Sequence, residues 1–141
     1  MRTLTAVLLF CAVAAVAAAQ NFNMVASNGA NPSVAATVTV SGVSGKSLVL
    51  DSICWGAQQA NAGTPVPASI IVFQILVGTT YVAVFPTPHQ ATSGPGQFAV
   101  PTFCTPPNFK VYGSVGADIT IRFNAGVTGA AQTISASGHE E

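Results

Sequence analysis

Charged side chains are scarce in this sequence. Lys and Arg total 4, Asp and Glu also total 4, and charged residues make up 6% of the 141 residues, against about a quarter in ordinary globular domains. So few positive charges exclude a basic patch and therefore a nucleic-acid-binding function. Because 50% of the residues are hydrophobic, the composition also excludes intrinsic disorder, which needs low hydrophobicity and high net charge.

Acids and bases for catalysis are equally few. The two histidines are His89, in a proline-rich stretch with no flanking acid, and His139, close to the end of the sequence. A pair of catalytic carboxylates would have to be Asp51 and Asp118, because the remaining two acids end the sequence. A triad needs a nucleophile, a histidine and a carboxylate that converge. We therefore predict that the protein is not an enzyme and uses no cofactor.

Metal ligands are sparse as well. The segment Phe103–Pro107 resembles the copper-ligand loop of cupredoxins, which are also β-sandwiches. That resemblance implies a thiolate at Cys104 and a histidine three to five residues later, whereas positions 107–109 hold Pro, Asn and Phe. We predict no metal site.

The N-terminus predicts export. Arg2 precedes an apolar run over residues 4–19, which ends in Ala17-Ala18-Ala19 and so fits a signal peptide spanning 1–19 that is cleaved before Gln20. The run is short for a membrane span, and no basic stop-transfer cluster follows it. We therefore expect a secreted protein with no stable membrane insertion after cleavage.

Cleavage would leave two of the three cysteines. Cys11 is lost with the signal peptide, and Cys54 and Cys104 remain. An even pair in an exported chain indicates a disulfide. We predict a bond between these two residues.

Short runs of β-branched and aromatic residues alternate with Gly, Pro and Asn turn signals, and no amphipathic helix is found. This pattern predicts about eight short strands in a single-domain antiparallel β-sandwich or jelly roll over 20–136, followed by a polar tail over 137–141. An alternating stretch within 20–31 is a candidate first edge strand. The other expected strand segments are 33–41, 47–55, 69–77, 81–85, 97–100, 108–115, 118–124 and 132–136. We expect hairpins between 69–77 and 81–85 and between 108–115 and 118–124.

Two of the expected strands have side-chain patterns that predict where their faces lie. Strict alternation in 47–55 would turn Leu48, Leu50, Ser52 and Cys54 one way, with the disulfide inside, and Val49, Asp51, Ile53 and Trp55 the other. The segment 69–77 is apolar on both faces, which predicts a central strand covered on each side.

The functional prediction is self-association or binding to other extracellular or surface proteins, because little charge keeps copies apart. The candidate binding surface comprises Val49, Ile53, Trp55, Tyr81 and Phe85. The alternative is an extracellular recognition module that binds polysaccharide through the loops 56–68 and 86–96. In that case Trp55, Tyr81, Phe85 and Tyr112 are candidates for stacking on sugar rings, although a core position for Trp55 is the more common outcome.

Overall fold

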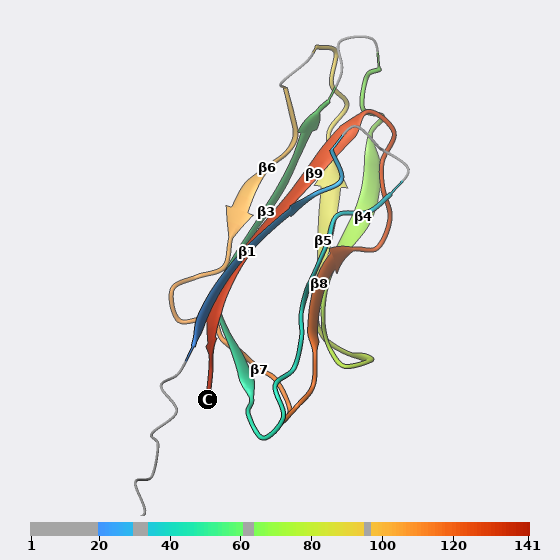
Figure 1. The fold of residues 1–141 in the computed structure, drawn as a ribbon. Coiled ribbons are helices and arrows are strands. Elements are labelled where there is room, and N and C mark those ends of the chain that lie inside the picture. The colour runs from blue at the N-terminus through green and yellow to red at the C-terminus, as the bar shows by residue number, and fades with distance from the viewer. Residues whose placement is uncertain (1–19, 30–33, 61–63, 95–96) are drawn as a thin grey trace, which may run out of the picture.

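A computed structural model describes residues 20–29, 34–60, 64–94 and 97–141, which form two antiparallel β-sheets packed face to face (Figure 1). The predicted signal peptide, 1–19, lies outside these residues and stays a prediction. Among the described residues there is no helix long and apolar enough to cross a membrane. The strands are β1 (Asn21–Ser27), β2 (Thr37–Val40), β3 (Leu48–Gln59), β4 (Ser69–Val77), β5 (Thr80–His89), β6 (Phe98–Cys104), β7 (Val111–Tyr112), β8 (Ile119–Phe123) and β9 (Ala130–Glu140).

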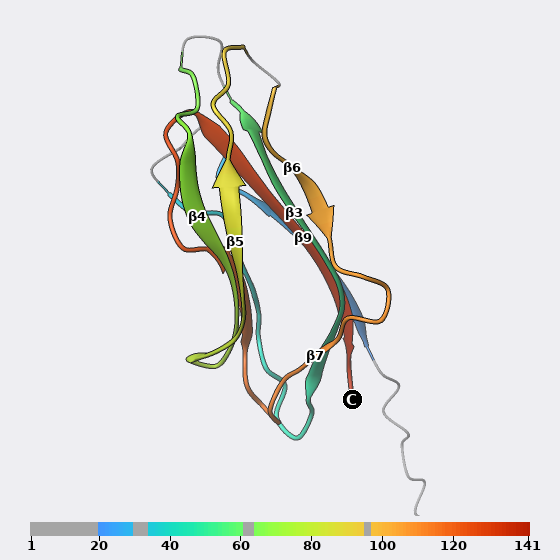
Figure 2. The ribbon, with the colours of Figure 1, turned by 180° about the vertical axis from the view of Figure 1, so that it is seen from behind.

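The strands divide into two layers. Sheet A has the order β1-β9-β3-β6, with β7 also paired to β3, and sheet B has the order β2-β8-β4-β5. The two views in Figures 1 and 2 show the layers with the core between them, the C-terminus at one end and the segments that follow β3 and β5 at the other. We call these the C-terminal end and the loop end. The predicted all-β sandwich is confirmed.

Aromatic rings from both sheets fill the middle of the core. Trp55 of β3 stacks on Phe73 of β4, with ring centroids 4.4 Å apart and planes 8° apart. Phe123 of β8 meets Phe73 edge-on at 5.3 Å, and Phe85 of β5 lies 5.4 Å from Trp55. Such contacts add to the burial of large apolar surfaces. Trp55 therefore lies in the core and not on the surface.

A β-bulge at Asp51 reverses the faces of β3. Along β9 the register steps from Leu50 directly to Ser52, so that Asp51 has no partner there. Inward-facing positions of β3 are even-numbered before the bulge and odd-numbered after it. The prediction that Cys54 points into the core on the same face as Leu48 is therefore wrong, because one extra residue changes the phase of a two-residue repeat.

β9 is longer than expected and runs the full length of sheet A. It pairs with β1 on one side and with β3 on the other. The pairing includes Ser137–Glu140, so the prediction of a polar tail over 137–141 is wrong for these residues. Backbone pairing on both sides supplies hydrogen bonds that do not depend on apolar side chains.

One predicted hairpin is confirmed and the other is wrong. β4 and β5 form an antiparallel hairpin across Gly78, whose φ is 58°, and β5 continues to His89, four residues past the predicted end at Phe85. By contrast, β7 pairs with β3 in sheet A while β8 lies between β2 and β4 in sheet B. The connection between β7 and β8 crosses from one layer to the other, which turn residues alone do not reveal.

β4 is central in sheet B, and sheet A packs against only one of its faces. Ile71, Phe73 and Ile75 face the core and are at most 7% exposed. Ile70, on the opposite face, is 76% exposed. The prediction that both faces of this strand are covered is therefore wrong at Ile70, whereas Leu76, on the same outer face, is 7% exposed.

Candidate functional site

The outer surface of the β4–β5 hairpin is apolar. Cross-strand register places Ile70 opposite Pro88 and Val72 opposite Pro86, and Val84 follows on the same side of β5. Ile70 is 76% and Val84 52% exposed. We call these five residues the hairpin face. Exposed contiguous apolar surface of this kind is typical of an interface.

A polar border separates the hairpin face from the rest of sheet B. The Nε of Arg122 donates to Oε1 of Gln74 at 3.0 Å, and its Nη2 lies 3.2 Å from the Tyr81 hydroxyl. Farther along the outer surface, the hydroxyls of Thr39 and Thr120 lie 3.3 Å apart. Arg122 thus brings one positive charge to the border, and its partners there are neutral.

The edge of β5 is blunted where it borders the hairpin face. The backbone N–H of Val72 donates to Asn124 Oδ1, and the Val72 carbonyl oxygen accepts from the Asn124 N–H. Both backbone groups of Val72 therefore point toward β8 and away from β5. Pro86, which is opposite Val72, therefore turns its backbone away from β4. Pro86 and Pro88 have no N–H to offer to an added strand. Contact through the face is thus favoured over extension of the sheet.

The predicted binding surface is not assembled. Val49 and Ile53 are 0% exposed and Trp55 is 8% exposed, so the prediction is wrong for these three residues. Phe85 is half-buried and packs against the core. Tyr81 is 53% exposed and borders the hairpin face through Arg122. The bulge in β3 explains why Ile53 and Trp55 point inward.

The residues of the hairpin face were missed for a specific reason. The sequence identifies Ile70 and Val72 as a second apolar face of their strand but predicts that this face is covered. Its prolines predict a loop over 86–96, whereas Pro86 and Pro88 are strand residues of β5. Val84, Pro86 and Pro88 are alternate residues, as expected for one face of a strand. This two-residue spacing is the signal in the sequence that could extend the predicted strand beyond Phe85.

Most of the charged groups gather at the C-terminal end of sheet A. Asp51 accepts from Lys110 Nζ at 2.6 Å and lies 2.7 Å from His139 Nδ1. His139 Nε2 lies 3.3 Å from Glu141 Oε1. Hydrogen bonds from Lys110 first, and then from His139, lower the pKa of Asp51. The pKa of His139 is raised by its hydrogen bond to Asp51 and, to a smaller extent, by its hydrogen bond to Glu141.

Val49 is buried next to this charge cluster. Val49 sits on the outer face of β3, between Tyr112 on β7 and His139 on β9 in the cross-strand register. Its 0% exposure thus arises outside the main core. Among the described residues, no group of three or more His, Cys, Asp and Glu side chains has an arrangement that could hold a metal ion.

The loop end carries buried polar groups. His89 is 3% exposed, and its Nδ1 lies 3.3 Å from the Thr87 carbonyl oxygen. Burial lowers the pKa of His89, against a smaller opposing effect of that bond. Thr92 joins the two predicted loops, since its Oγ1 donates to Gln59 Oε1 at 2.6 Å and accepts from the Val66 N–H at 3.1 Å.

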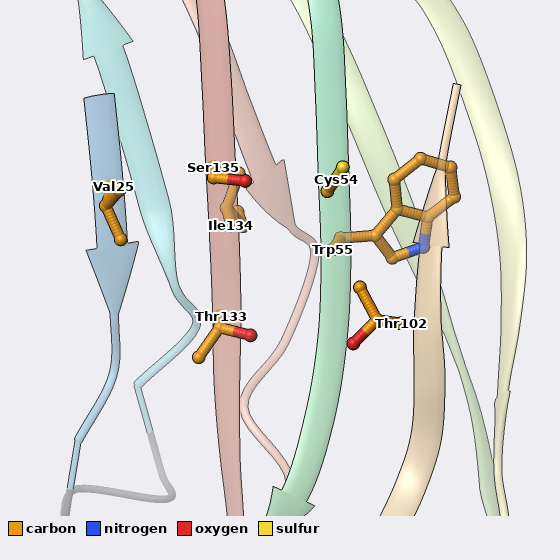
Figure 3. Close-up of a pocket in the computed structure, with 7 residues that line it drawn as sticks. All are labelled: Val25, Cys54, Trp55, Thr102, Thr133, Ile134 and Ser135. Carbon is orange, nitrogen blue, oxygen red and sulfur yellow. The ribbon is translucent and has the colours of Figure 1, made fainter. Parts of the chain in front are cut away.

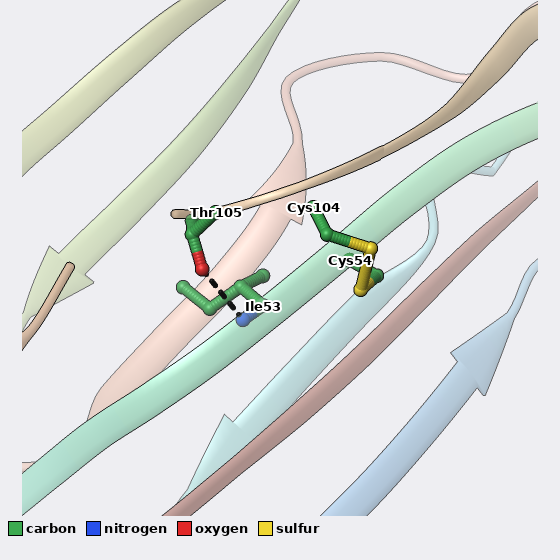
Figure 4. The surroundings of a disulfide bond; sticks show 4 residues. All are labelled: Ile53, Cys54, Cys104 and Thr105. Atoms are coloured by element: carbon green, nitrogen blue, oxygen red, sulfur yellow. Dashed lines mark hydrogen bonds between the residues drawn. A yellow bond between two sulfur atoms is a disulfide. The ribbon is translucent and has the colours of Figure 1, made fainter. Parts of the chain in front are cut away.

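The disulfide between Cys54 and Cys104 is confirmed (Figure 4). The two residues are direct cross-strand partners in β3 and β6, with Cα atoms 4.0 Å apart. Thr105, next in sequence, accepts the Ile53 N–H at its Oγ1 and donates its own N–H to the Ile53 carbonyl oxygen. A disulfide is typical of a non-reducing environment.

No protein-family model matches this chain, and comparison with curated proteins found no match either.

Proposed function

We propose that this protein is a secreted, non-enzymatic β-sandwich that associates with copies of itself through the hairpin face. The observation that supports the proposal most directly is the exposure of apolar side chains on that face, with Ile70 at 76% and Val84 at 52%. Removing such side chains from water contributes about 25 cal/mol per Å² of apolar surface. The blunted β5 edge directs that contact to the face of the sheet.

A second copy is the partner that the composition favours. The formal net charge is +0 and charged residues make up 6% of the sequence, so electrostatic repulsion between copies is weak. A two-fold contact would place the hairpin face of one copy on that of the other. Arg122, on the border, would stay at the solvated rim in both copies, where its charge costs little.

Sedimentation velocity across a dilution series tests this function. We expect the wild type to shift from monomer to a larger species as concentration rises, and Ile70→Glu to stay monomeric because its carboxylate would lose water in the contact. Val25→Glu is the matched control, since Val25 is also 76% exposed but lies on β1 in sheet A.

Two outcomes would contradict the proposal. One is a wild type that stays monomeric at the highest concentration, and binding of that monomer to an immobilised polysaccharide would favour the recognition module instead. The other is equal weakening of association by Ile70→Glu and Val25→Glu, which would mean that the hairpin face is not the contact.

A further inference from the structure

The disulfide lies outside the core, on the surface of sheet A that faces away from sheet B. Cys104 is exposed and Cys54 is half-buried, and neither belongs to the core cluster. The reversal of β3 at Asp51 is what places Cys54 on this outer face. The sulfur atoms are thus on the solvent side of a sheet whose other side holds the Trp55 ring.

The bond joins two strands that are already neighbours. Cys54 and Cys104 are paired in register within sheet A, and Thr105 holds Ile53 through two further hydrogen bonds. The two sheets are held together by inward-facing side chains, such as the stack of Trp55 on Phe73 at 4.4 Å. Breaking the sulfur–sulfur bond therefore removes no contact between the sheets.

A shallow hollow of about 80 Å³ lies beside Cys54 (Figure 3). Its lining residues are Val25, Cys54, Trp55, Thr102, Thr133, Ile134 and Ser135. The outward-facing members come from all four strands of the β1-β9-β3-β6 path and are small. None of the lining side chains carries a charge, so nothing in the lining repels an approaching thiolate.

We propose that Cys54–Cys104 is a site of thiol–disulfide exchange in the folded protein, and that its co-reactant is a low-molecular-weight thiol. The thiolate sulfur attacks Sγ of Cys54, which lines the hollow, and forms a mixed disulfide there. The Cys54–Cys104 bond breaks with its electron pair on Sγ of Cys104, the more exposed half, which takes a proton from solvent. A second thiolate then attacks the external sulfur of the mixed disulfide, which releases Cys54 as a thiolate that solvent protonates and leaves the two external thiols oxidised to a disulfide.

This proposal is independent of self-association. It assigns the outer face of sheet A to covalent chemistry with thiols, while the hairpin face lies on the outside of sheet B. Exposure governs the susceptibility of disulfides to exchange, and buried structural disulfides react only when the protein opens.

The test uses the purified oxidised protein, reduced glutathione and no denaturant. Quenching with iodoacetamide at successive times, followed by intact-mass measurement, counts mixed disulfide and free thiols. We expect the rate of mixed-disulfide and thiol formation to be proportional to glutathione concentration. Far-UV circular dichroism and Trp55 fluorescence should stay unchanged while these products accumulate. Thiols that appear at a rate independent of glutathione and accelerated by dilute urea would show that exchange requires unfolding, which overturns the proposal.

Substitutions at Thr102 test the route of attack. Thr102 lies on β6 two residues before Cys104 and lines the hollow. Thr102→Tyr should slow exchange several-fold by covering the sulfur atoms, while Thr102→Ser keeps the hollow open and should exchange at the wild-type rate. Should the tyrosine variant fail to fold, Ser135→Tyr covers Cys54 from β9, where Ser135 is its direct partner. Equal rates in the folded covered and open variants would overturn attack from this face.

Discussion

Asp51 joins three parts of the chain that are far apart in sequence. The bulge projects its carboxylate to the outer face of β3, where Lys110, 59 residues later, and His139, 88 residues later, both reach it. Lys46 and Glu140 form a second ion pair near the same end, at 2.9 Å. A single extra residue in β3 thus positions the carboxylate that binds both Lys110 and His139.

His139 should stabilise the fold in a pH-dependent way. Its pKa is raised in the folded state, so its contribution is present in full below the unfolded value, near 6.5, and is lost as pH rises through the folded value. We expect His139→Gln to lower the melting temperature at pH 5.5 and to have little effect at about pH 9. The effect should be modest, because the His139 and Asp51 side chains are 22% and 36% exposed.

Lys110→Gln is the control for that measurement. It removes the other partner of Asp51, but a lysine stays charged throughout this range. Its effect on the melting temperature should therefore be the same at both pH values. A His139→Gln variant that also shows no difference between the two pH values would contradict the role of the ion pair.

His89 should act with the opposite sign. Burial lowers the pKa of His89 in the folded state. As pH falls below about 6.5, the unfolded chain therefore binds a proton at His89 before the folded chain does, and the free energy of unfolding decreases. Among the described residues, no acidic side chain offsets this effect, because the pKa of His89 responds to burial and to the Thr87 carbonyl alone. Melting temperatures of His89→Gln should therefore fall less steeply than those of the wild type between pH 7 and pH 5. Parallel pH curves would contradict this.

At the scale of single elements, a glycine in β9 allows close contact with the neighbouring strands β1 and β3. Gly138 lies between Leu50 on β3 and Phe22 on β1 in the register. A Cβ at this position would collide with the Val49 carbonyl oxygen and with the Phe22 ring. The absence of a side chain is therefore what lets β9 pass the start of β3 next to the Asp51 bulge.

Gly138→Ala should destabilise the protein by about 1–3 kcal/mol, because a carbonyl oxygen of the backbone has to move to admit the methyl group. Chemical denaturation measures this. Gly94→Ala is the control, since the nearest atoms to its added Cβ are those of the Gln97 side chain, 3.8 Å away or more. Equal unfolding free energies of the two variants would show that the contact at Gly138 relaxes without cost.

Two adjacent isoleucines of β4 differ strongly in their exposure to solvent. Ile71 is 7% exposed and its neighbour Ile70 is 76% exposed. Ile71→Asp should cost more than about 4 kcal/mol or prevent secretion, because it buries a carboxylate without a partner, whereas Ile70→Asp should fold normally. Thermal melts of both variants decide this, and equal loss of stability would mean that the outer face is also covered.

At the scale of the whole molecule, polarity is distributed unevenly. The ion pairs lie at the C-terminal end. Buried amide, hydroxyl and imidazole groups lie at the loop end, and apolar residues are exposed on the outer surface of sheet B. Such a molecule has little charge with which to steer or repel a partner. Hydrophobic contact is the interaction that remains for the hairpin face.

Self-association should therefore persist at high salt. Screening weakens interactions between exposed charges, and at 1 M salt the Debye length is only about 3 Å. The sedimentation profile of the wild type should be unchanged, or shifted to larger species, between low and high salt. Dissociation as salt rises would assign the contact to ion pairs and contradict a hydrophobic interface.

Composition and local pattern alone determined a good deal of this protein. Alternation in the β1 and β2 segments, the Gly78 turn and the pairing of Cys54 with Cys104 follow from short-range physics and from an even cysteine count. These features depend on neighbours in sequence, or on the small number of possible partners.

Tertiary structure alone decided the rest. The bulge at Asp51 is invisible in a period of two, yet it turns Trp55 into the core and Cys54 out to solvent. Periodicity likewise shows that β4 has two apolar faces, but not that only one meets another layer. β7 and β8 separate into different sheets because each pairs with strands distant in sequence. Each of these outcomes depends on contacts between distant segments, whose register and layer are set by packing of the whole chain.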